Sequence, residues 1–99
     1  MNEVEFRNWL STQNENRKIQ SDIISRLKRI EREIDHCDID EQYYSDKCKY
    51  ILSLFLNMGI NEEMKKYPYA NFPIGKYAMS TFRYAIKKYV KFCDEIYIK

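Results

Sequence analysis

The chain has 99 residues and a formal net charge of +2, and 44% of its residues are hydrophobic, including nine tyrosines and five phenylalanines. A chain of this size and apolar content is expected to form one folded domain, residues 1–99, with a packed core. It is not expected to be disordered. No apolar run approaches the ~20 residues of a membrane span, and the opening MNEVEFRNWL lacks the pattern of a signal peptide. We therefore expect a cytoplasmic protein with no membrane association.

Two helices are predicted in the amino-terminal third of the chain, and the scarcity of glycine and proline favours helices throughout. The first helix should run from Asn2 to about Thr12, because this segment places its apolar and aromatic side chains on one helical face. After the polar STQNEN, Asn14 or Asn16 can cap a second helix, which should end near His36 or Cys37. The inward stripe of this second helix is Ile19, Ile23, Leu27, Ile30 and Ile34.

Two more helices are predicted after the acidic turn DHCDIDEQ. Asp38 or Asp40 can cap the third, and Gly59 can end it. Its inward stripe is Tyr44, Cys48, Ile51, Phe55 and Met58. A short helical turn at 62–67 and a proline-containing loop should precede the last helix, which starts at Gly75 or Lys76. The inward stripe of that helix is Ala78, Phe82, Ala85, Tyr89, Phe92 and Ile96. The sequence thus predicts an all-α protein, a single compact bundle of four to five helices.

Catalytic and metal-binding patterns are missing. His36, the one histidine, neighbours Cys37, and adjacent residues at a helix end rarely face each other as a nucleophile and its base do. One histidine and three scattered cysteines lack the C-x-x-C spacing of a zinc site, and DIDE lacks the glycine and distal glutamate of a calcium loop. We expect no enzyme, no metal and no cofactor, and we expect the thiols to be reduced and packed as small apolar groups.

Charged residues are segregated along the chain. Six acids between Glu33 and Asp46 have no lysine or arginine among them, whereas five cations between Lys76 and Lys91 have no acid among them. The second helix carries six more cations from Arg17 to Arg32. These cations can simply be the solvated faces of two helices. Because pairing within the last helix cannot neutralise its cations, the distribution also predicts a basic surface for an anionic partner.

FRNWL followed by KIQSDIISRLKRIEREI, and MSTFRYAIKKYVKFCDE at 79–95, are similar to the opening and the closing helix of one known domain. They resemble the SAM-like core-binding (N-terminal) domain of tyrosine recombinases and phage integrases. The resemblance implies a bundle that clamps one side of duplex DNA, with the second and last helices at the major groove and its phosphates. Strand cleavage is not implied, because the chain ends before any catalytic domain. It is either a fragment of a recombinase or a free-standing domain, for example a regulator from a phage or mobile element.

The positions that would contact DNA are also those that helical wheels place opposite the core. They are Lys18, Lys28, Arg29 and Arg32 in the second helix, and Arg83, Tyr84, Lys87, Lys88 and Lys91 in the last.

The alternative is a protein-interaction module, such as a small phage-encoded or mobile-element-encoded inhibitor of a host protein. Aromatic side chains are frequent interface anchors, and the segment KKYPYANFPIGKYAM concentrates four of them, Tyr67, Tyr69, Phe72 and Tyr77. The sequence leaves the oligomeric state and any preferred DNA sequence open.

Overall fold

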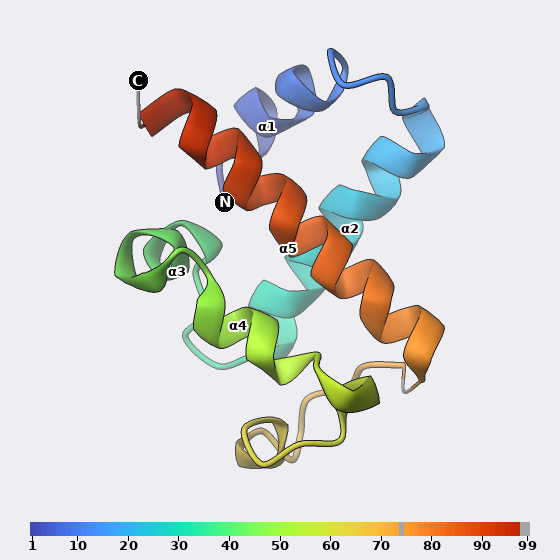
Figure 1. Ribbon diagram of the computed structural model, residues 1–99, viewed down its shortest axis with the longest axis vertical. Coiled ribbons are helices and arrows are strands. Elements are labelled where there is room, and N and C mark those ends of the chain that lie inside the picture. The colour runs from blue at the N-terminus through green and yellow to red at the C-terminus, as the bar shows by residue number, and fades with distance from the viewer. Residues whose placement is uncertain (74, 98–99) are drawn as a thin grey trace.

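The fold was analysed in a computed structural model that describes residues 1–73 and 75–97, and every regular element within these ranges is a helix. In chain order these elements are α1 (Glu3–Leu10), α2 (Arg17–Glu33), α3 (Ile39–Asp46), α4 (Lys49–Leu54), the 3-10 turns η1 (Asn57–Gly59) and η2 (Met64–Lys66), and α5 (Lys76–Tyr97). The expected all-α bundle is confirmed. Figure 1 shows α5 running diagonally across the molecule and crossing α2, which lies behind it.

Local chemistry explains where α2 begins and ends. The side chain of Asn16 accepts a hydrogen bond of 2.8 Å from the backbone N–H of Ile19, which confirms one of the two expected caps. The helix ends at Glu33, earlier than predicted, because Ile34 is extended and His36 adopts a left-handed conformation. The predicted stripe is buried except for Ile19, which is exposed in the first turn of the helix.

The predicted third helix is in fact two helices, α3 and α4. Lys47 and Cys48 both adopt left-handed conformations, with φ of 56° and 65°, and these stop the α-helical hydrogen-bond ladder. The break changes the helical phase, so Tyr43 is buried while Tyr44, predicted to point inward, is exposed. Met58 is also exposed, contrary to the prediction. Cys48, Ile51 and Phe55 are buried as expected.

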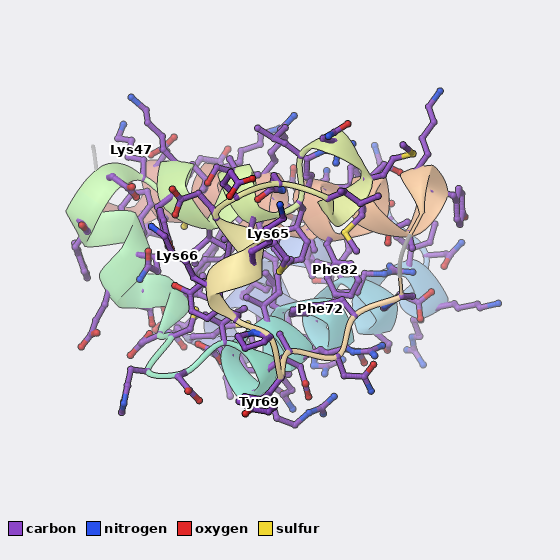
Figure 2. All side chains as sticks on the ribbon, turned by 90° about the horizontal axis from the view of Figure 1, so that it is seen from below. Lys47, Lys65, Lys66, Tyr69, Phe72 and Phe82 are labelled. Carbon is purple, nitrogen blue, oxygen red and sulfur yellow. The ribbon has the colours of Figure 1, made fainter. Side chains whose placement is uncertain are left out.

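Two aromatic clusters lie along the buried side of α5. At its carboxyl-terminal half, Phe6 of α1 packs 4.8 Å from Tyr89 and 5.2 Å from Phe92, measured between ring centroids. At its amino-terminal half, Phe82 packs 5.3 Å from Phe55 and 5.2 Å from Phe72. Figure 2 shows Phe72 and Phe82 pointing toward each other between the layer of α4 and α5 and the layer that holds α2. Of the predicted inward stripe of α5, Phe82, Ala85, Tyr89 and Phe92 are buried and Ala78 is half-buried, whereas Ile96 is exposed, contrary to the prediction.

Carboxylates of the acidic turn form contacts within the protein. Asp38 caps α3 by accepting a bond of 2.9 Å from the N–H of Asp40, as expected for one of the two candidates. The amino group of Met1 lies 3.1 Å from Glu31, 3.5 Å from Asp38 and 3.3 Å from Asp40. The buried Tyr89 hydroxyl donates to Asp40. These contacts link the carboxylates to the amino terminus of the chain and, through Tyr89, to α5.

The three cysteines are free thiols, with Cys48 and Cys93 buried and Cys37 half-buried. Burial raises the pKa of each thiol, to about 11 for Cys37 and about 12 for the other two. The expected packing of the thiols as small apolar groups is confirmed for Cys48 and Cys93.

Candidate nucleic-acid interface

The outward face of α5 carries a row of polar side chains with no acid among them. The row repeats every three or four residues and consists of Lys76, Ser80, Tyr84, Lys87 and Lys91, which we call the α5 stripe. Its three lysines are exposed, and none forms an ion pair with any residue that the structure describes. At 1.5 Å per residue, the stripe extends for about 22 Å along the helix. The stripe is thus a basic row that the fold leaves accessible.

Glu15, in the linker before α2, neutralises one edge of the stripe. The Tyr84 hydroxyl donates a hydrogen bond of 2.5 Å to Glu15, and the ammonium of Lys88 lies 3.4 Å from the same carboxylate oxygen. The bond from Tyr84 and the ion pair with Lys88 lower the pKa of Glu15 below its usual value. Because only 17% of the Lys88 side chain is exposed, Lys88 acts in this state as a partner of Glu15 rather than as a free cation.

Arg83 forms a hydrogen bond with another helix. Its guanidinium donates to the carbonyl oxygen of Phe55, at the carboxyl end of α4. The last carbonyls of a helix have no partner within it, so this bond satisfies a group that would otherwise lack one. Arg83 therefore links α5 to α4 and presents less of its charge to solvent than the lysines of the stripe.

The predicted cations of α2 turn to separate parts of the molecule. Lys28 pairs with Glu3 of α1 at 2.6 Å, and Arg32 pairs with its neighbour Glu33 at 3.1 Å. The Nε and Nη2 atoms of Arg29 donate to the carbonyl oxygen of Asn71 at 3.1 and 2.8 Å. Lys18 is exposed and forms no ion pair within the described part of the chain.

These contacts do not bring the nine predicted residues together on one surface. Lys28 turns toward α1, Arg29 toward the loop before α5, and Arg83 toward the end of α4. Lys18, Lys87 and Lys91 remain exposed and unpaired among the described residues. Lys76 and Ser80 were not among the predicted contacts, although their spacing from Tyr84 and Lys87 places them on the same helical face.

The loop aromatics considered as protein-interface anchors also separate into two groups. Phe72 is only 9% exposed and belongs to the core, so its assignment as a surface anchor is corrected. Tyr67 is half-buried, and its hydroxyl lies 2.9 Å from that of Tyr50. Tyr69 and Tyr77 are 95% and 83% exposed. Only these last two present most of their surface to a partner.

Comparison with known proteins adds no relative: no protein-family model, no curated protein and no solved structure matches this chain. Within residues 1–73 and 75–97, no three side chains of His, Cys, Asp or Glu gather as metal ligands. None of the helices in those ranges is long and apolar enough to span a membrane.

Proposed function

We propose that this protein is a non-catalytic module that binds the phosphate backbone of duplex DNA through the α5 stripe. The observation that carries the proposal is the row of three exposed lysines on α5, which form no ion pair with a described residue and have no acid between them from Lys76 to Lys91. Lysine is a point charge that binds phosphate without requiring a fixed base edge. The Ser80 and Tyr84 hydroxyls, which lie between the lysines, can bind phosphate oxygens as well. Three such contacts give weak binding that depends little on sequence, with a Kd of roughly 10⁻⁴ to 10⁻⁶ M.

The resemblance to the core-binding domain of tyrosine recombinases supports this function, because that domain also contacts DNA from its closing helix. The proposed contact differs from a two-helix clamp. Lys28, Arg29 and Arg32 of α2 are held by partners within the chain, so α5 carries the larger share. In the acidic turn, Asp38 and Asp40 lie 3.5 and 3.3 Å from the amino group of Met1, and Asp40 also accepts a hydrogen bond from the Tyr89 hydroxyl. These contacts offset part of the negative charge that would repel a phosphate backbone.

Salt dependence tests the proposal. Each phosphate neutralised on duplex DNA contributes about −0.9 to the slope of log K against log salt, so three lysines predict a slope of about −3. Fluorescence anisotropy with a labelled 20-base-pair duplex, measured between 50 and 300 mM KCl, gives this slope. A slope near zero, or no binding at 50 mM, would contradict DNA binding by the stripe. Duplexes of unrelated sequence should give the same result.

Removing the charge of Glu15 should increase DNA affinity. Glu15→Gln frees the ammonium of Lys88 and takes away the strong acceptor of the Tyr84 hydroxyl. One more available phosphate contact should lower the Kd about three- to ten-fold at 50 mM salt and make the slope steeper by about 1. The matched control is Glu62→Gln, which removes the same charge from an exposed residue of the loop between η1 and η2. If both variants raise affinity equally, net charge and not the stripe is responsible.

One observation favours a protein partner as the second candidate. Leu56, Met58 and Ile60 are all exposed, around a turn where Asn57, Met58 and Gly59 have positive φ. Neighbouring exposed apolar side chains can form a contact surface, and residues in sparsely populated backbone conformations concentrate at functional sites. Absence of DNA binding at 50 mM salt would make this surface the leading candidate.

A further inference from the structure

A cleft of about 310 Å³ opens between α2 and the first turns of α5. It is lined by residues that include Ser25, Arg26 and Arg29 of α2, Pro73 of the loop, and Tyr77 and Phe82 of α5. None of these residues belongs to the α5 stripe. The volume lies at the lower end of the range for small-molecule sites, about 300 to 1,000 Å³.

The cleft carries two guanidinium groups, and none of its described lining residues is an acid. Arg26 is half-buried and forms neither an ion pair nor a hydrogen bond with a described residue. Arg29 is fixed by its two bonds to the Asn71 carbonyl and by the Phe72 ring, 5.9 Å from its Cζ atom. These bonds use Nε and Nη2 and leave Nη1 available to a ligand. One guanidinium without a partner and one already held in place form a site for a doubly charged oxyanion such as a phosphate.

The rest of the lining suits a flat ring. Pro73, Ala78 and Phe82 give the cleft a mainly apolar wall. The Tyr77 ring stands at the rim and is 83% exposed, so one of its faces is open for stacking. Aromatic side chains stack on nucleic-acid bases with little preference among the bases. A ligand that joins a ring to a phosphate over a short distance therefore satisfies both parts of the cleft.

We propose that this cleft binds a nucleotide, with its phosphate held by Arg26 and Arg29 and its base lying against Tyr77. The site does not depend on the proposed contact between the α5 stripe and duplex DNA, because the two share no residue. The nucleotide can be a free mononucleotide or one unit of a single strand. Both present the same phosphate and ring.

A titration of the ¹⁵N-labelled full chain, followed by amide chemical shifts, tests the site. The probes are AMP, ribose 5-phosphate, adenosine, inorganic phosphate and an eight-residue oligothymidylate. AMP should shift the amides of 25–29 and 77–82 and saturate, and each probe that lacks the base or the phosphate should bind at least about five-fold more weakly. Tighter binding of the oligonucleotide at the same amides assigns the site to a strand, and tighter binding of AMP assigns it to a free nucleotide.

Equal affinity for AMP and inorganic phosphate would overturn the proposal, because the cleft would then bind any anion. Shifts confined to other residues, or no shifts at millimolar AMP, would also overturn it.

Two variants separate the parts of the site. Arg26→Gln should weaken AMP binding about ten-fold or more and leave the fold intact, because Arg26 has no partner among the described residues. Tyr77→Ala should weaken it about five-fold or more. The controls are Lys18→Gln, an exposed cation of the same helix, and Tyr69→Ala, an exposed tyrosine outside the cleft. Affinity unchanged in Arg26→Gln, or lowered equally in Lys18→Gln, would contradict the assignment. The double variant Lys87→Glu/Lys91→Glu should bind AMP like the wild-type chain, which separates this site from the α5 stripe.

Discussion

Replacing Lys87 and Lys91 with glutamate should weaken binding to duplex DNA about 100-fold at 50 mM salt, equally for unrelated sequences. Both ammonium groups lie on the α5 stripe, are exposed and have no partner among the described residues, so their charge is available to phosphate. The variant removes two attractive contacts and adds two repulsive ones. It should therefore also reduce the magnitude of the salt slope by about 2. Anisotropy titrations at four salt concentrations measure the affinity and the slope together.

The matched control is Lys65→Glu/Lys66→Glu. These two lysines lie on the η2 turn, where Figure 2 labels them, and their side chains are exposed. Both double variants change the net charge equally, so a general effect of charge would weaken DNA binding by the same factor in each. Equal losses would place the contact elsewhere than on α5. Circular dichroism should show the same helix content and thermal transition for the α5 variant as for the wild-type chain.

Replacing Phe72 with alanine should lower the free energy of unfolding by about 3 kcal/mol. The ring is 9% exposed and packs against Phe55 and Phe82, with both pairs of ring centroids 5.2 Å apart. The preceding residue is fixed as well, because the N–H of Asn71 donates to Glu33 and its carbonyl accepts from Arg29. Truncation at position 72 therefore leaves a cavity that the loop cannot easily collapse to fill.

Tyr69→Ala is the matched comparison, because Tyr69 is an aromatic residue of the same loop and is 95% exposed. It should change stability by less than about 0.5 kcal/mol. Urea unfolding followed by circular dichroism measures both variants. If Phe72→Ala is no more destabilising than Tyr69→Ala, the loop does not dock on the core, and Phe72 returns as a candidate interface anchor.

The features that depend on local interactions could be predicted from the sequence. The apolar stripe of α5, the start of that helix at Lys76, and the caps Asn16 and Asp38 all depend on residues within a few positions of each other. Helical periodicity and capping operate over this range, so a single sequence contains the information they need.

The break between α3 and α4 could not be predicted from local sequence patterns. Lys47 and Cys48 adopt left-handed conformations without the glycine or asparagine that usually signals one. The apolar spacing from Tyr44 through Cys48 to Ile51 continues across the break, so periodicity alone predicted one helix. Packing of Tyr43 and Cys48 into the same core decides the actual path, and that depends on segments distant in the chain.

The sequence by itself determined that this chain is an all-α bundle whose last helix carries five cations and no acid from Lys76 to Lys91. Only the tertiary structure decided which cations remain available to a partner. Glu3 reaches Lys28, Glu15 reaches Lys88, and the Phe55 carbonyl reaches Arg83 across 28 positions of sequence. A helical wheel shows which side of a helix a residue occupies, but an ion pair forms where folding brings another segment within a few ångströms. For the same reason the sequence did not show that Arg26 lies in a cleft between α2, the proline loop and α5.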